Sequence, residues 1–282
     1  MTLNLNRRVL LAGLAMPFIV RPAVAQAPVT LDQLKQAGVI KIGLVNQPPY
    51  SALNPDGTIG GFVPTLVQEI MAKLGVEKVE PYVATYGELI PGLQARRWQM
   101  IAAAFRLTKE RCGQVLFTDP VTFDGGAIAY LGKNFDKPPA SYAELGKVDG
   151  MVGVLQASYI IALILKAGVA KDRIMEFPSN QTMVDGLEVG RVKTIVSTNS
   201  ALQQLNRQRN SFSIAYPVPE DAPVGSAPAF SVDDTELHAQ FQTQLRAMRE
   251  SGELQKMAAE FGFDPPPQNL VGISAEDACA RL

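Results

Sequence analysis

Histidine and cysteine are scarce in this sequence of 282 residues, which has one histidine, His238, and two cysteines, Cys112 and Cys279. No group of His, Cys and Asp has the spacing of a metal site, and a single remote histidine excludes a Ser–His–Asp triad. The sequence therefore predicts no catalytic residue, no bound metal and no cofactor. In an oxidising compartment the two cysteines form one disulfide or remain separate thiols, and the sequence leaves both open.

The chain also lacks an excess of charge of either sign. It has 26 Lys and Arg against 27 Asp and Glu, which gives a net charge of −1. This balance argues against nucleic acid and a membrane surface as partners. Beyond the first 25 residues, no apolar run is long enough for a transmembrane helix.

The first 25 residues have the features of an export signal. Arg7 and Arg8 precede a mostly apolar stretch, and Ala23-Val24-Ala25 matches the small-x-small cleavage rule. Cleavage is expected after Ala25 or after Ala27, although a membrane anchor is the alternative. The paired arginines fit the twin-arginine export route as well as the general one. No cysteine lies at the cleavage site, so we expect a periplasmic protein without a lipid anchor.

The remaining chain shows two runs of alternating strand and helix patterns. Such alternation predicts an α/β fold of two lobes, each a mostly parallel sheet flanked by helices. In the first run Thr85 and Glu88 resemble a capping box, but Pro91 favours a helix start nearer Glu88. The strands are expected at 39–45, 77–83 and 100–105, then at 151–155, 173–177, 193–197 and 212–216.

Two short apolar stretches lie between the runs, Gly126 to Leu131 and Ser226 to Val232. We expect them to cross between the lobes as a pair of hinge strands. The expected boundaries are a signal peptide at 1–25, a first lobe at 28–130 and 227–268, a second lobe at 131–226, and a loose C-terminal tail at 269–282.

A candidate ligand site follows from the rule that open α/β sheets bind ligands at the carboxyl ends of their strands. The side chains there offer aromatic faces, guanidinium groups, hydroxyls and amides, a set suited to a carboxylate with an apolar or cationic body. The predicted ligand-binding residues are Gln47, Tyr50, Tyr86, Phe105, Arg106, Arg111, Ser158, Tyr159, Thr198 and Asn199.

Several motifs in order carry a family resemblance. They include Leu107-Thr108-Lys109-Glu110-Arg111, then Phe117-Thr118-Asp119-Pro120, and Val152-Gly153-Val154-Leu155-Gln156 in the second run. Over roughly 39–263 the chain resembles the family 3 periplasmic solute-binding proteins of polar amino-acid ABC importers. It looks closest to their ectoine-binding branch. The resemblance implies the type II two-lobed fold, closure over a ligand, and an ABC permease as partner.

The resemblance also implies roles for individual residues. Arg111 matches the arginine that grips the ligand carboxylate, and Ser158 a hydroxyl that meets it from the second lobe. Tyr50 and Tyr86 match flanking aromatic side chains. Thr198 departs from the pattern, because amino-acid binders usually carry there an Asp that pairs with the α-ammonium.

Further departures at the site concern its charge. Gln47 and Ile160 stand where the ectoine-binding branch has acidic residues, and Arg106 adds a positive charge unless it faces solvent. A cleft more cationic than that of a zwitterion binder is therefore expected, with an organic acid or an amide-bearing or cyclic carboxylate as ligand. We expect a monomeric, non-enzymatic binding protein. The alternatives are a periplasmic dehydratase-like enzyme on the same scaffold, and an adaptor that reports the ligand to a membrane receptor.

Overall fold

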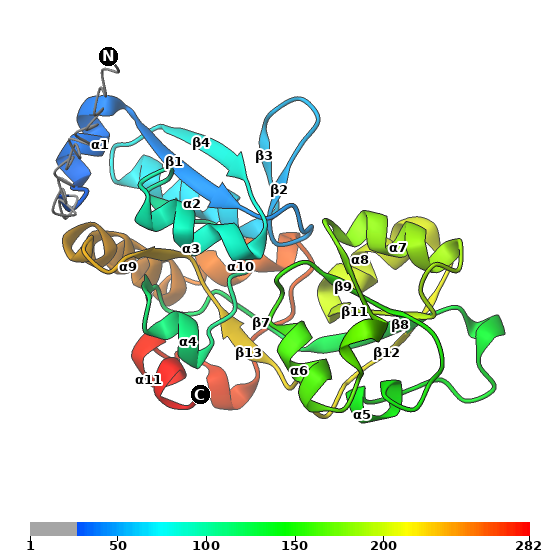
Figure 1. The fold of residues 1–282 in the computed structure, drawn as a ribbon. Helices are drawn as coiled ribbons and strands as arrows, with labels where there is room; N and C mark the ends of the chain where they lie inside the picture. The colour runs from blue at the N-terminus through cyan, green and yellow to red at the C-terminus, as the bar shows by residue number, and fades with distance from the viewer. Residues whose placement is uncertain (1–26) are drawn as a thin grey trace, which may run out of the picture.

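The computed structural model describes residues 27–282, so the export signal expected at 1–25 lies outside the described residues. These residues form two lobes side by side, each built on a five-stranded sheet (Figure 1). The predicted two-lobed α/β architecture is confirmed. Within this range no helix combines the length and the apolar character needed to cross a membrane.

The sheet of the first lobe is mostly parallel around β1. Strand β1 pairs in parallel with β4 and β5, whereas β14 runs antiparallel between β5 and β6. Ile40, Ile42 and Leu44 of β1 alternate along the strand and are fully buried against helices α2, α9 and α10. The strand order is β4 (Lys78–Val83), β1 (Val39–Leu44), β5 (Met100–Ile101), β14 (Ala229–Ser231) and β6 (Val115–Phe117). The helices are α1 (Leu31–Ala37), α2 (Phe62–Lys73), α3 (Tyr86–Gln94), α4 (Lys109–Cys112), α9 (Thr235–Glu250) and α10 (Glu253–Glu260), and β2 (Ala52–Leu53) pairs with β3 (Ile59–Gly60).

The second lobe repeats this plan. Strand β9 pairs in parallel with β10 and β11, and β8 runs antiparallel between β11 and β12. Apolar residues cover both faces, because Ile195 packs toward α7 and α8 while Val154 packs toward α6. The strand order is β10 (Ile174–Phe177), β9 (Val152–Leu155), β11 (Thr194–Thr198), β8 (Gly126–Tyr130) and β12 (Ser213–Ala215). The helices are α5 (Tyr142–Leu145), α6 (Ile160–Lys166), α7 (Asn180–Glu188) and α8 (Asn199–Arg209), with short 3-10 turns at Gly132–Asn134 and Lys171–Arg173.

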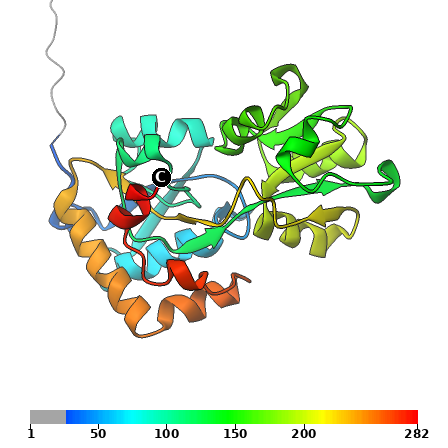
Figure 2. The same cartoon turned by 90° about the horizontal axis from the view of Figure 1, so that it is seen from below.

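The lobes are joined by a short antiparallel pair, β7 (Thr122–Asp124) and β13 (Val224–Ser226). The two chain segments that cross between the lobes are seen from below in Figure 2. The prediction that 126–131 and 226–232 are the crossing strands is wrong. Residues 126–130 form β8 inside the second sheet and 229–231 form β14 inside the first, and their apolar character reflects that burial.

Helix α3 begins at Tyr86, two residues before the expected start near Glu88. The start of the helix is capped by Glu88, because Glu88 Oε2 accepts hydrogen bonds from the amide and the hydroxyl of Thr85, each at 2.8 Å. Pro91 lies inside the helix and removes one hydrogen bond, but the cap fixes the first turn. This register places the Tyr86 side chain at the start of α3.

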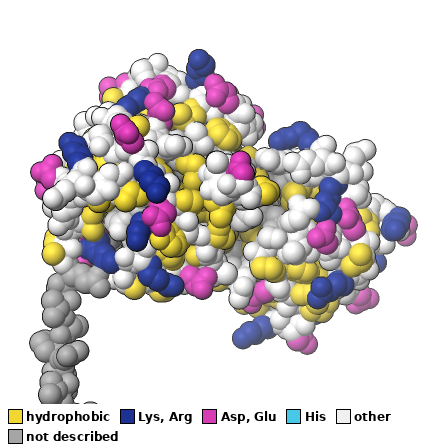
Figure 3. Space-filling model, turned by 90° about the horizontal axis from the view of Figure 1, so that it is seen from above, with side chains coloured by type: hydrophobic (Ala, Val, Ile, Leu, Met, Phe, Trp, Pro, Cys, Tyr) yellow, Lys and Arg dark blue, Asp and Glu magenta, His cyan; other side chains and the backbone are white. Residues whose placement is uncertain are grey.

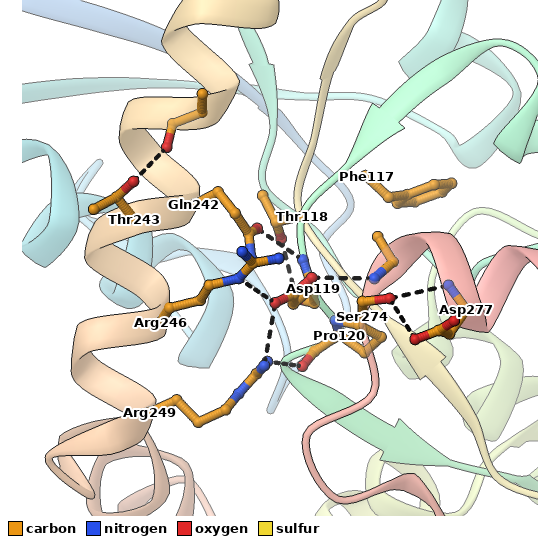
Figure 4. Close-up of polar contacts among 12 residues, drawn as sticks. Phe117, Thr118, Asp119, Pro120, Gln242, Thr243, Arg246, Arg249, Ser274 and Asp277 are labelled. Carbon is orange, nitrogen blue, oxygen red and sulfur yellow. Dashed lines mark hydrogen bonds and ion pairs between the residues drawn. The ribbon is translucent and has the colours of Figure 1, made fainter.

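The C-terminal segment, expected to be loose, is fixed to the first lobe. A 3-10 turn (Gln268–Leu270) leads into helix α11 (Ala275–Ala280). Cys279 of α11 forms a disulfide with Cys112 of α4. Asp119 lies between α9 and α11, where its carboxylate accepts from the Ala275 amide at 3.1 Å (Figure 4). Arg246 and Arg249 of α9 pair with the same carboxylate. A covalent bond and this buried carboxylate hold the segment in place.

Candidate functional site

A cavity lies where the two lobes meet. The molecule narrows at this junction when seen from above (Figure 3). A junction between two lobes is a usual place for a small-molecule ligand. The residues that line it are Gln47, Tyr50, Tyr86, Ala104, Arg106, Arg111, Asp124, Leu155, Ser158, Tyr159, Ile160, Ser197, Thr198 and Ser226.

Arg111 brings a cation to this cavity from the first lobe. It lies in the single turn of α4, which is capped by the Thr108 side chain. Its Nη1 donates to the carbonyl of Arg106 at 3.0 Å, and its guanidinium lies 4.1 Å from the ring centre of Phe105. Burial lowers the pKa of Arg111. Among residues 27–282 it forms no ion pair, so its charge is available to an anionic ligand.

Ser158 faces the same cavity from the second lobe. It precedes α6, is 8% exposed, and its Oγ has no hydrogen-bond partner among the described residues. A buried hydroxyl without a partner is unfavourable, so this atom is suited to a polar ligand group. Asn199, at the start of α8, also has an unpartnered Oδ1, but it does not line the cavity.

Tyr86, Gln47 and Thr198 form a hydrogen-bonded chain across the two lobes. The Tyr86 hydroxyl donates to Gln47 Oε1, and Gln47 Nε2 donates to Thr198 Oγ1 at 3.4 Å. Burial raises the pKa of Tyr86 to about 12, so the phenol stays a donor at neutral pH. Gln47 therefore lines the cavity and also connects the two lobes.

Tyr50 and Asp124 form a buried pair at the base of the cavity. Tyr50 is 1% exposed, packs on Phe263, and donates its hydroxyl to Asp124 Oδ2. The Asp124 carboxylate also accepts the amides of Gly125 and Ser200, each at 2.9 Å. Burial is the main cause that raises the pKa of both Tyr50 and Asp124. Asp124 was not predicted, and its one signal is a carboxylate in an apolar stretch just before two glycines.

Arg106 lines the cavity but is fully engaged. It forms an ion pair with Asp221 at 2.8 Å, donates to the Tyr159 hydroxyl at 3.1 Å, and lies over the Tyr159 ring. The Tyr159 hydroxyl in turn donates to Asp221 at 3.1 Å. The expectation of a cleft more cationic than that of a zwitterion binder is therefore wrong. Asp221 neutralises Arg106, and Asp124 adds a carboxylate that the sequence reasoning did not include.

Two predicted site residues lie away from the cavity wall. Phe105 is buried in the first lobe, where its ring packs against Phe117. The Arg111 guanidinium stacks on the Phe105 ring. Asn199 lies beside the wall, with its amide bound to the Gly125 carbonyl. The other predicted site residues all line the cavity. The residues that the prediction left out are mostly small or apolar, and short side chains carry no sequence signal for a ligand.

No group of three or more His, Cys, Asp or Glu side chains within 27–282 could hold a metal ion. His238 lies in α9, where its Nε2 contacts the carbonyl of Phe117 at 2.8 Å, and it does not line the cavity. The side chains that line the cavity offer guanidinium, carboxylate, hydroxyl and aromatic groups.

The chain is similar to known proteins along most of its length. A probable amino-acid ABC transporter periplasmic-binding protein, y4tE, of Sinorhizobium fredii is 28% identical over 248 residues, covering 84% of this chain and 81% of that protein. The crystal structure of EhuB in complex with hydroxyectoine superposes with a TM-score of 0.83 at 29% identity, covering 89% of this chain and 97% of EhuB. The fold is shared with the ancestral amino acid-binding protein AncCDT-1, a precursor of cyclohexadienyl dehydratase, at a TM-score of 0.74 and 24% identity over 84% of this chain and 100% of that one. The model of the bacterial extracellular solute-binding proteins, family 3, matches residues 40–264. The chain therefore belongs to family 3 of the bacterial extracellular solute-binding proteins.

Proposed function

We propose that this chain captures a small carboxylate-bearing solute between its lobes and delivers it to an ABC permease. The observation that carries the proposal is the half-buried Arg111 side chain, which lines the cavity without an ion pair among the described residues. A guanidinium and a carboxylate form two parallel hydrogen bonds. The unpartnered Ser158 Oγ supplies a further donor from the second lobe.

Closure of the lobes is the proposed mechanism. A solute that contacts Arg111 on one lobe and Ser158 on the other binds the closed form better than the open form, and this difference shifts the population toward closure. The Gln47–Thr198 hydrogen bond would form as the lobes meet. The closed form is the one that we expect the permease to recognise. The expected first-lobe boundary at residue 130 is too late, because β8 (Gly126–Tyr130) belongs to the second sheet. We propose that the protein acts as a monomer.

The test is to identify the solute that the protein retains during purification, by mass spectrometry of the denatured extract. Its affinity is then measured by calorimetry after the protein has been refolded without it. A solute with a carboxylate and a dissociation constant in the micromolar range or below supports the proposal. A retained solute that has no acidic group would contradict the role of Arg111.

We propose that the site carries out no covalent chemistry. The dehydratase-like alternative needs a general acid or base at the cavity. Glu88 is unsuited, because the amide and hydroxyl of Thr85 hold the pKa of its carboxyl below the ordinary value. Asp124 is the cavity-lining carboxylate among the described residues, and three hydrogen bonds already engage it. Unchanged solute after prolonged incubation supports binding alone, whereas a dehydrated product would establish an enzyme.

Export to the periplasm completes the proposal. Residues 1–25 are proposed as the signal, and a structural disulfide fits an oxidising compartment. N-terminal sequencing of the exported protein distinguishes cleavage after Ala25 from cleavage after Ala27. Replacing Arg7 and Arg8 together by Lys abolishes twin-arginine export and leaves the general route intact. A pulldown from membranes separates a permease partner from the receptor that the adaptor alternative requires.

A further inference from the structure

The Arg106 side chain connects the two lobes near the point where the chain crosses between them. Its backbone belongs to the first lobe, because its carbonyl accepts from Arg111 and it pairs with Ser226 of β13. Its guanidinium forms an ion pair at 2.8 Å with Asp221 and lies 4.2 Å from the ring centre of Tyr159, both in the second lobe. We propose that Arg106 is a positioning residue that holds the lobes together through Asp221 without binding the solute. This inference rests on the proposed solute-binding function and concerns its closure step.

Asp221 is fixed within the second lobe. Its carbonyl accepts the Gly126 amide of β8 at 3.2 Å, and its Oδ2 accepts the hydroxyls of Tyr142 at 2.9 Å and Tyr159 at 3.1 Å. The Asp221 side chain is fully buried, and it does not line the cavity between the lobes. A solute in that cavity therefore does not contact this carboxylate, whereas Arg106 does.

The Arg106 guanidinium also contacts both chain segments that cross between the lobes. Nη1 donates to the carbonyl of Asp124 in β7, and Nη2 donates to the carbonyl of Ala222 just before β13, each at 3.2 Å. Nη1 donates further to the Tyr159 hydroxyl at 3.1 Å. Protein groups thus engage both terminal nitrogens, so Arg106 is poorly placed to grip a solute even though it lines the cavity.

Burial makes this ion pair sensitive to the arrangement of the lobes. Arg106 is 9% exposed, and the groups that contact its guanidinium come from the second lobe and from the crossing segments. A buried cation requires a paired carboxylate, whereas a hydrated one does not. When the lobes separate, water reaches the guanidinium and its pairing with Asp221 contributes less. The pair therefore favours the arrangement in which the lobes are together.

Lobes that are held together before the solute arrives lower the cost of closure. The apparent affinity of a solute rises with the fraction of the protein that already has the binding-competent arrangement. If Arg106 raises that fraction, every solute gains by the same factor, whatever its charge. A direct contact between Arg106 and the solute would instead favour anionic solutes alone.

The experiment measures the arrangement of the lobes in the absence of any solute. Solution scattering of the refolded mature chain gives the radius of gyration of the wild type, of Arg106→Gln and of Asp221→Asn. Asp221→Asn is the more informative variant, because it breaks the ion pair at a residue that does not line the cavity. The control is Arg96→Gln, which breaks the buried ion pair of Arg96 with Asp234 inside the first lobe.

The expected result is that both variants of the pair have a larger radius of gyration than the wild type. Loss of a buried charge partner should lower the ratio of compact to open protein about 30-fold or more. Saturation with the retained solute should return Arg106→Gln and Asp221→Asn to the wild-type value, and the affinity of Asp221→Asn should fall by up to about 30-fold. Arg96→Gln should lower the thermal midpoint and leave the radius unchanged.

Two results would overturn the inference. One is a folded Asp221→Asn that is as compact without solute as the wild type, even if Arg106→Gln binds the solute more weakly. The other is a wild type that contracts clearly when the solute is added, and this result needs no variant to fold. In both cases the wild type still binds its solute, so the proposed solute-binding function stands. A wild type that binds no solute refutes that function whatever the scattering shows.

Discussion

Cys112 is joined by a disulfide to Cys279, 167 residues further along the chain, and Cys112 directly follows the cavity residue Arg111. The bond fastens helix α11 to helix α4, which is only four residues long. Such a short helix has little stability of its own. The C-terminal segment therefore supports the turn that presents the Arg111 guanidinium to the cavity.

Replacement of both cysteines by serine should lower the free energy of unfolding by about 2–5 kcal/mol, since the disulfide closes a long loop. Solute affinity should fall as well, because α4 loses its covalent anchor next to Arg111. Urea unfolding and calorimetry measure the two effects. Reductant should destabilise the wild type and have no effect on the double variant. Equal stability of the wild type with and without reductant would show that the bond contributes nothing.

Ser158→Ala separates a ligand contact from a structural one. The Ser158 hydroxyl has no partner among the described residues, so its removal should leave the stability of the solute-free protein unchanged or slightly higher. Solute affinity should fall roughly 10- to 100-fold, the range for a hydrogen bond to a charged group.

The matched control for Ser158 is Ser51→Ala, which lies outside the cavity lining. The buried Ser51 hydroxyl donates to the Val45 carbonyl at 2.6 Å, so its loss leaves a buried acceptor unsatisfied and should lower the free energy of unfolding by about 1–3 kcal/mol. Thermal unfolding and calorimetry of both variants give the comparison. Equal affinities of Ser158→Ala and the wild type would remove Ser158 from the site.

Asp119 and Asp124 should contribute slopes of opposite sign to the dependence of the free energy of unfolding on pH. Burial acts to raise the pKa of Asp119, but hydrogen bonds from Arg246 and the Ala275 amide outweigh it and hold that pKa below its ordinary value of 3.8. Asp119 therefore adds stability above pH 3.8 that is lost as the pH falls through the folded pKa. Asp119→Asn should flatten this acid limb of the stability curve.

Asp124 behaves in the opposite way, because burial raises its pKa above 3.8. The folded state then binds more protons than the unfolded state between 3.8 and the raised value, so this group lowers stability as the pH rises through that window. Asp124→Asn should remove that decline. Urea midpoints measured across this pH range in the absence of solute give both slopes. Parallel curves for the wild type and both variants would contradict the assignments.

The Gln47–Thr198 contact should favour the closed form. Gln47→Ala removes the hydrogen bond between the lobes and the acceptor of the Tyr86 hydroxyl. We expect a larger radius of gyration in solution scattering without solute, and a return to the wild-type value when solute saturates the site. Gln203→Ala, an exposed change in α8, is the control. A variant as compact as the wild type would show that this contact does not govern closure.

The features that the sequence predicted are those with a period or a motif. Alternating strand and helix patterns predicted both lobes, and the positions after the strands predicted most of the cavity wall, including Arg111 and Ser158. The lobes were predictable from the local alternation of apolar residues, and the cavity wall from the rule that ligands bind at the carboxyl ends of parallel strands. The crossing strands were placed wrongly because buried strands and connecting strands are both short and apolar.

Long-range pairings were beyond sequence reasoning. Arg106 was expected to add free positive charge, yet Asp221 lies more than a hundred residues away and neutralises it. Asp124 went unnoticed because nothing local marks a carboxylate that a neighbouring strand brings beside Thr198. The firm attachment of the C-terminal segment depends likewise on Asp119 and the disulfide, both of which need the folded chain.

Binding of the retained solute to Arg111→Ala tests the account most directly. Removing one partner of a buried ion pair costs about 2–5 kcal/mol, so calorimetry should show an affinity lower by roughly 30- to 4,000-fold. Arg97→Ala, an exposed arginine on the same lobe, should bind like the wild type. If Arg111→Ala is folded and binds the solute as tightly as the wild type does, the carboxylate does not meet this guanidinium and the proposed site is wrong.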